Sequence, residues 1–259
     1  MFEMRIGFVG TGGITRAIVT GLLKAGAGIE AIAVSNRNAH IAKDLAALHP
    51  KVRVCGSNQQ VLEASDVVCL AVRPQVARDV IRELDFAQTH RVISFIPGLR
   101  TDELARLIPH VAGIARAVPL PAVEQRIGTT SVYPPDDAAC ELFSTIGTVV
   151  EVESEDQFDC LHAATATMAS YFAFMQSQAD WLIAKGLPPE KARSFLSSYC
   201  AGMAHRAEHT DYSFPELIQH SITPGGINEK VLLELSSAGA FDLYPHALDG
   251  ALAWINGVR

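Results

Sequence analysis

A glycine-rich segment near the amino end of the chain has the composition of a phosphate-binding turn. It reads Gly10, Thr11, Gly12, Gly13, Ile14 and Thr15, and it lies between an apolar run and a helical pattern. Glycines allow a tight turn there and let the backbone approach a pyrophosphate at the helix N-terminus. The usual third glycine is Thr15, so the position between strand and helix carries the prediction more than the motif itself. The alternative is a glycine-rich turn without a ligand.

The residues after the second expected strand indicate which dinucleotide would bind. Ala31–Val34 is followed by Ser35, Asn36 and Arg37, without the acidic residue that usually binds the ribose hydroxyls of NAD. A hydroxyl and a guanidinium suit a 2′-phosphate instead, so NADP(H) is the predicted cofactor. The alternative is that Arg37 is a solvated residue at a helix start.

Three histidines have spacings that could do chemistry. His162 is a candidate proton source on a helix, although a structural or surface role is the favoured interpretation of its position. His205 and His209 are four residues apart and could share a metal ion. No third ligand is evident beside them and no HExxH motif is present, so we expect a solvated helix face and no metal site.

The elements that must position these residues change in character along the chain. Residues 1–152 alternate β-branched runs with helical stretches, which predicts βαβ units in a Rossmann-type, doubly wound, mainly parallel sheet. Residues 153–259 lack strand patterns, which predicts an all-α domain. The expected strands are Arg5–Val9, Ala31–Val34, Arg53–Cys55, Val67–Val72, Arg91–Phe95, Gly113–Ala117, Thr129–Val132 and Thr148–Val152.

One long helix, Asp156–Ile183, is expected to be apolar on two faces. A helix of this kind is normally buried on both sides, which predicts a homodimer, or a higher homo-oligomer, through the helical domain. Further helices are expected over Thr15–Ala25, Asn38–Leu48, Pro189–His209, Phe214–Gln219, Ile227–Ala238 and Asp242–Asn256.

Composition excludes several other classes of protein. A net charge of -7 argues against binding a nucleic-acid backbone, and no apolar run is long enough for a membrane span. The 5 cysteines are scattered and never spaced CxxC, which is typical of reduced thiols in a cytoplasmic protein. The amino end shows no signal-peptide pattern.

At several points the sequence resembles the pyrroline-5-carboxylate reductase family. Phe8–Leu22 is similar to the family's opening segment, and Asp66–Gln75 is similar to its second cofactor segment. Ser94–Gly98, Arg116–Pro119 and Thr223–Gly226 follow in the family's order. The resemblance implies that Ala71, Val72, Arg73 and Pro74 lie beside the cofactor and that the protein reduces a small cyclic imine, 1-pyrroline-5-carboxylate, to proline.

The resemblance also implies a substrate site. Thr165 and Thr167 keep hydroxyls of a family segment and are candidate catalytic residues together with Asn228. A turn that opens a helix would hold the substrate carboxylate, and its residues are Thr223, Gly225, Gly226, Ile227 and Asn228. An ordinary helix start is the alternative for this turn, and back-bonding to a carbonyl is the alternative for the threonines.

Departures from the family pattern leave the substrate open. Thr165–Tyr171 lacks the family's glycines and proline, so we expect the helix to run through this segment regularly. Asn228 would then be the main side-chain donor to a carboxylate. The alternatives are a related reductase acting on another imine or keto compound, or a non-catalytic NADP(H)-binding sensor.

Overall fold

The structure is a computed structural model that describes residues 4–26 and 28–257. The chain divides into two compact units, one formed by Met1–His162 with Ala253–Arg259 and the other by Ala163–Leu252. The first is called the sheet unit below and the second the helical unit. This division falls about ten residues beyond the predicted boundary at 152/153, since most of the first helix after the last strand belongs to the sheet unit.

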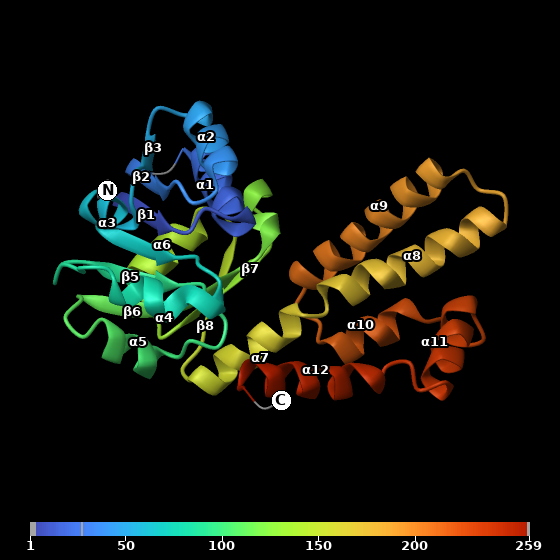
Figure 1. Cartoon of the computed structure of the whole chain (residues 1–259). Coiled ribbons are helices and arrows are strands. Elements are labelled where there is room, and N and C mark those ends of the chain that lie inside the picture. Colours follow the sequence, from blue (N-terminus) through green and yellow to red (C-terminus); the bar gives the residue numbers. More distant parts are fainter. Residues whose placement is uncertain (1–3, 27, 258–259) are drawn as a thin grey trace. The chain divides into compact units, whose positions relative to one another are not determined.

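The sheet unit contains one 8-stranded sheet in the order β3-β2-β1-β4-β5-β6-β7-β8 (Figure 1). All neighbouring pairs are parallel except β6 and β7. The mainly parallel, doubly wound Rossmann-type sheet is therefore confirmed. The strands are β1 (Met4–Val9), β2 (Ile29–Ser35), β3 (Val52–Cys55), β4 (Val67–Leu70), β5 (Arg91–Ser94), β6 (Gly113–Pro119), β7 (Thr129–Tyr133) and β8 (Thr148–Glu151).

Both faces of this sheet are covered, because successive side chains of each central strand point to opposite sides. Cys69 of β4 belongs to one buried apolar cluster, while its neighbours Val68 and Leu70 belong to the other. The first cluster takes residues from α1 (Gly13–Ala25), α2 (Ala39–Leu48), η1 (Pro121–Gln125) and α6 (Asp137–Ser144). The second takes residues from α3 (Asn58–Glu63), α4 (Pro74–Arg82) and α5 (Thr101–Leu107).

The helical unit has no described strand and is built on a hairpin of two long helices, α8 (Met168–Ala184) and α9 (Pro189–Glu208), joined by a turn at Gly186 (Figure 1). Its all-α character confirms the prediction. The helices after β8 are α7 (Glu155–Thr165), α8 (Met168–Ala184), α9 (Pro189–Glu208), α10 (Phe214–Ser221), α11 (Ile227–Ser237) and α12 (Leu243–Ile255). None of the helices in the described part of the chain is long and apolar enough to cross a membrane.

The expectation of one regular helix through Thr165–Tyr171 is wrong. α7 ends at Thr165 and α8 begins at Met168, although neither glycine nor proline lies between them. The Thr167 amide bonds to the Ala164 carbonyl three residues back at 3.2 Å, and the Thr167 hydroxyl donates to the same oxygen at 2.8 Å. A threonine side chain that takes a backbone carbonyl in this way competes with the helical hydrogen bond, which explains the break.

Candidate functional site

The order of the sheet reverses between β1 and β4, and the two strands end side by side at that point. In a doubly wound sheet, ligands bind outside the carboxyl ends of the strands at this switch point. Gly10 follows β1 with a φ of 106°, and a Cβ on it would lie 2.4 Å from the Ala71 carbonyl oxygen after β4. Only glycine fits this close approach between the two loops.

Buried hydroxyls hold the glycine turn in shape. The Gly10 amide donates to Ser35 Oγ at 3.0 Å, and Thr11 Oγ1 donates to the Ser35 carbonyl at 2.5 Å. Thr15 Oγ1 donates to the Gly10 carbonyl at 2.7 Å and is fully buried. Thr15 therefore closes the turn at the position where the usual fingerprint has its third glycine.

Ser35 is buried, whereas the predicted contact with a 2′-phosphate needs a hydroxyl at the surface. Its side chain is 1% exposed and already bonds to Gly10 and Thr11. A hydroxyl committed to the glycine turn is not available to a 2′-phosphate at the surface. Ser35 thus holds the glycine turn in shape.

The N-terminus of α1 is open. Ideal Cβ atoms on Gly12 and Gly13 would meet nothing within 4 Å, and Gly12 caps the helix without any side-chain hydrogen bond. Among the described residues, the amides of Gly13, Ile14 and Thr15 have no hydrogen-bond partner. Unfilled N–H groups at a helix N-terminus, with room in front of them, suit a pyrophosphate.

The ends of β2 and β4 present the remaining cofactor candidates. Asn36 and Arg37 are exposed after β2, and Asn38 accepts from the Ile41 amide as the cap of α2. After β4, Val72 is buried while Arg73 is exposed and caps α4, with Pro74 in the first turn. The predicted strand to Val72 ends at Leu70 in the structure, so residues 71–73 form the loop facing the glycine turn and Pro74 begins α4.

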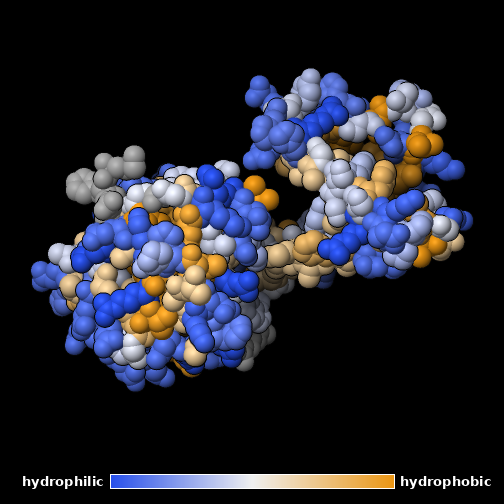
Figure 2. Space-filling model, turned by 90° about the horizontal axis from the view of Figure 1, so that it is seen from above, coloured by the Kyte–Doolittle hydropathy of each residue, from blue (hydrophilic) through white to orange (hydrophobic). Residues whose placement is uncertain are grey.

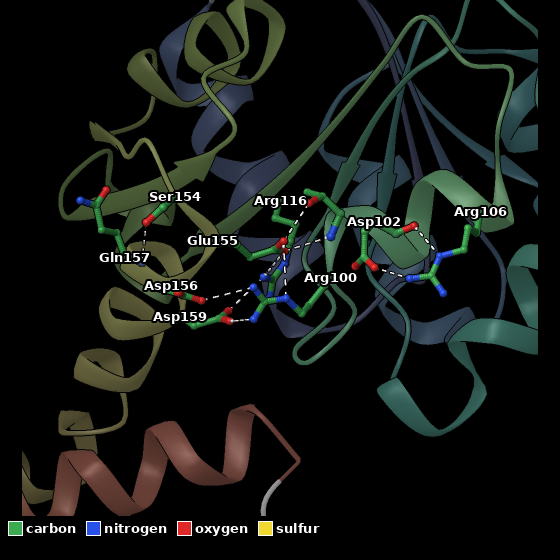
Figure 3. Close-up of polar contacts among 10 residues, drawn as sticks. Arg100, Asp102, Arg106, Arg116, Ser154, Glu155, Asp156, Gln157 and Asp159 are labelled. Atoms are coloured by element: carbon green, nitrogen blue, oxygen red, sulfur yellow. Dashed lines mark hydrogen bonds and ion pairs between the residues drawn. The ribbon is translucent and has the colours of Figure 1, made fainter.

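A cluster of charged side chains, which the sequence analysis did not predict, joins β6 to the start of α7 (Figure 3). Arg116 is 1% exposed, and its Nη1 lies 2.7 Å from Glu155 and 2.9 Å from Asp159. Arg100 reaches Asp159 at 3.0 Å, and the Arg116 guanidinium lies 4.5 Å from the Phe158 ring centre. The sequence did contain an indication of this cluster. Arg116 lies within an apolar strand, and a buried arginine needs acidic partners.

His162 follows this cluster on α7. Burial lowers the pKa of its imidazole, the charge of Arg116 lowers it further, and Asp159 opposes the shift. The imidazole is therefore neutral at neutral pH. A neutral imidazole is a weaker proton donor than an imidazolium, so the lowered pKa does not favour the role of proton source that was considered from the sequence.

The threonine candidates lie at the break between α7 and α8. Thr165 is the last residue of α7 and is half-buried. Thr167 donates its hydroxyl proton to the Ala164 carbonyl, so this hydroxyl can only accept from a ligand. Since α7 ends at Thr165 and α8 begins at Met168, Thr165 lies at the end of a helix and Thr167 lies between two helices, and neither residue is in the middle of a helix.

The candidate carboxylate turn precedes α11. Gly225 has a φ of 74°, and the Gly226 amide bonds to the Thr223 carbonyl at 2.7 Å. Asn228 Nδ2 donates to the Ser221 carbonyl at 2.8 Å, so this side chain closes the turn and is not the open donor that was expected. The Gly225 amide donates to a carboxylate oxygen of Glu229 at 2.6 Å, a contact the sequence analysis missed.

The histidine pair on α9 has a third candidate ligand that was not expected. One ligand atom each from His205, Glu208 and His209 lie within 4.8 Å of one another, and all three residues are exposed. His209, the residue that caps the end of α9, also has its Nδ1 2.9 Å from the His205 carbonyl oxygen. Among all the predicted site residues, those for the cofactor lie in the sheet unit and those for the substrate lie in the helical unit.

Comparison with known proteins matches both parts of the chain. Residues 5–98 match the family model described as NADP oxidoreductase, coenzyme F420-dependent, which confirms the prediction of an NADP-type cofactor domain. Residues 155–255 match the model of the pyrroline-5-carboxylate reductase dimerisation domain, which supports a homo-oligomer.

Relatives resemble the chain over nearly its full length. The pyrroline-5-carboxylate reductase of Vibrio alginolyticus is 28% identical, with 98% of this chain and 97% of the relative covered. The enzyme of Escherichia coli K12 is also 28% identical, covering 92% and 91%. The solved structure of the Coxiella burnetii enzyme has a TM-score of 0.85 at 27% identity and covers 99% of each chain. The resemblance to the pyrroline-5-carboxylate reductase family that the sequence indicated is confirmed over nearly the whole chain.

Proposed function

We propose that the protein is an NADPH-dependent reductase of a small cyclic imine and converts 1-pyrroline-5-carboxylate to proline. The observation that carries the proposal is the open N-terminus of α1 beside the close approach of Gly10 to Ala71. The names of the full-length relatives supply the substrate. Binding of the cofactor is assigned to residues 1–152, and binding of the substrate and of a second copy to residues 153–259.

The residues at the switch point fit the cofactor. The amides of Gly13 and Ile14, with Gly10, Thr11 and Gly12, would bind the pyrophosphate. Arg37 and Asn36 are exposed and would bind the 2′-phosphate, with Ser35 supporting the turn. NADPH, when bound, supplies the hydride that is added to the imine carbon, while the imine nitrogen gains a proton. Ala71, Val72, Arg73 and Pro74 would line the adjacent loop.

In the helical unit, the chain's residues mainly need to hold the substrate and orient its ring. The amides of Ile227 and Asn228 have no hydrogen-bond partner among the described residues and would donate to a substrate carboxylate held in the turn Thr223, Gly225 and Gly226. Thr165 and Thr167 are proposed to face the imine, where the Thr167 hydroxyl can accept a hydrogen bond, since its own proton is donated to the Ala164 carbonyl. Asn228 acts through its backbone amide and by closing the turn.

We further propose that two copies associate through the helical unit and that the protein works in the cytoplasm. Large apolar side chains reach the surface of this unit, as the orange areas among its blue residues show (Figure 2). All 5 cysteines are free thiols, which suits a reducing compartment.

Loss of NADPH absorbance with a panel of cyclic imines and keto acids tests the proposal. Turnover of 1-pyrroline-5-carboxylate supports it. Turnover of other compounds alone supports the related-reductase alternative, which the altered Thr165–Tyr171 segment favours. Cofactor binding without any turnover supports a sensor.

A further inference from the structure

Glu229 occupies the turn in which a substrate carboxylate is proposed to bind. It is the third residue of α11, and its carboxylate reaches back to the Gly225 amide at 2.6 Å. Gly226, the cap of the helix, has no side chain to fill this role. The chain therefore supplies its own anion to the turn.

The internal bonds of the turn leave few donors for a second carboxylate. The Gly225 amide is taken by Glu229, the Gly226 amide by Thr223, and the Asn228 side chain by Ser221. The open amides of Ile227 and Asn228 lie within one helical turn of the Glu229 charge. An anion placed there meets like-charge repulsion from Glu229, and the positive end of the helix is already partly neutralised.

We propose that Glu229 is a specificity-determining residue that weakens binding of substrates carrying a carboxylate next to the imine. A cyclic imine without a carboxylate has no charge to place in the turn and does not compete with Glu229. The protein therefore accepts 1-pyrroline-5-carboxylate at a reduced affinity and discriminates little against uncharged cyclic imines. This inference rests on the proposed function, because it concerns the same substrate turn.

Glu229→Gln tests this inference, because glutamine can still accept the Gly225 hydrogen bond while the charge is lost. The matched control is Glu216→Gln on α10, where Glu216 is also the third helical residue and accepts from the Ser213 amide at 2.7 Å. Both variants are compared with the wild type in steady-state turnover of 1-pyrroline-5-carboxylate and of 1-pyrroline, which lacks the carboxylate.

In Glu229→Gln, the ratio of kcat/KM for 1-pyrroline-5-carboxylate to that for 1-pyrroline should rise about tenfold, mainly through KM. Glu216→Gln should leave the ratio as in the wild type. An unchanged ratio in Glu229→Gln, with thermal unfolding like that of the control, overturns the inference.

A binding measurement separates this result from a failure of the proposed function. L-proline and pyrrolidine are titrated onto the protein loaded with NADP⁺, and the heats are measured without turnover. Glu229→Gln should bind proline about tenfold more tightly and pyrrolidine unchanged. If no imine is reduced but this shift appears, the inference holds and the proposed reaction fails. If imines are reduced but neither the titration nor the ratio changes, the reaction holds and the inference fails.

Discussion

The two units of the chain differ in how they bury apolar side chains. In the sheet unit, residues such as Phe8, Ile32 and Phe143 are fully buried in clusters on both faces of the sheet. In the helical unit, no described residue of α8, α10, α11 or α12 is fully buried. Phe214 is 77% exposed and Ile227 is 82% exposed. The sheet unit completes its own core, whereas the helical unit presents the surface of a protein that associates.

Substitution on α8 should produce the largest effect. Phe172 of α8 and Ile127 of the sheet unit are both 61% exposed. Phe172→Asp would bury an unpaired carboxylate in an interface between copies, at a cost of roughly 3–5 kcal/mol. Ile127→Asp would leave its charge in water. Sedimentation of the wild type should show a dimer or larger assembly, with Phe172→Asp dissociated and Ile127→Asp unchanged. A wild type that is monomeric at micromolar concentration contradicts the comparison.

The charged cluster on α7 should produce the next largest effect, on the stability of the sheet unit. Arg116→Met leaves Asp159 and Glu155 buried without their main partner, which should lower the free energy of unfolding by about 3–5 kcal/mol. The control is Arg106→Met, which breaks the exposed pair of Arg106 with Asp102 on α5 and should cost about 0–1 kcal/mol. Urea unfolding measures both. Equal losses of unfolding free energy in the two variants would mean that the buried cluster stabilises the sheet unit no more than an exposed ion pair does.

Cofactor affinity should depend on the sheet unit and not on the helical unit. Arg37→Ala removes a charge-assisted contact to a 2′-phosphate and should weaken NADPH binding by about 1.5–3 kcal/mol, while NADH binding stays unchanged. Asn228→Ala, in the helical unit, should leave NADPH binding as it is. Fluorescence titration of both cofactors measures these affinities. Equal binding of NADPH and NADH by the wild type would contradict the NADP(H) assignment.

The sheet unit could be predicted from its sequence because its pattern is local. Runs such as Val67–Leu70 are apolar on both faces, and each of the eight expected strands is present within a few residues. The order of the strands and the close approach of Gly10 to Ala71 are known only from the structure, because they depend on how distant segments pair. The glycine turn was likewise predicted in the right place.

The exact partners of polar side chains could not be predicted, because they depend on residues far apart in the sequence. Ser35 looked like a phosphate ligand but bonds to Gly10, 25 residues away. Arg116 and Asp159 are separated by 43 positions. The break at Thr167 and the capping of Gly225 by Glu229 are local, yet each depends on a choice between competing hydrogen bonds that composition does not decide.

The smallest expected effect concerns pH and His162, in the last turn of α7 within the sheet unit. Its folded-state pKa is lowered from the usual 6.5 by burial and by Arg116, with Asp159 opposing. The unfolded chain then binds the proton more readily, so stability is lost as pH falls through and below about 6.5. His162→Gln should flatten the dependence of the melting temperature on pH over this range by a few degrees at most, relative to the wild type. His110→Gln, which changes an exposed histidine of the same unit, should retain the wild-type slope. If His162→Gln and His110→Gln give the same slope, the surroundings of His162 do not lower its pKa in the folded protein.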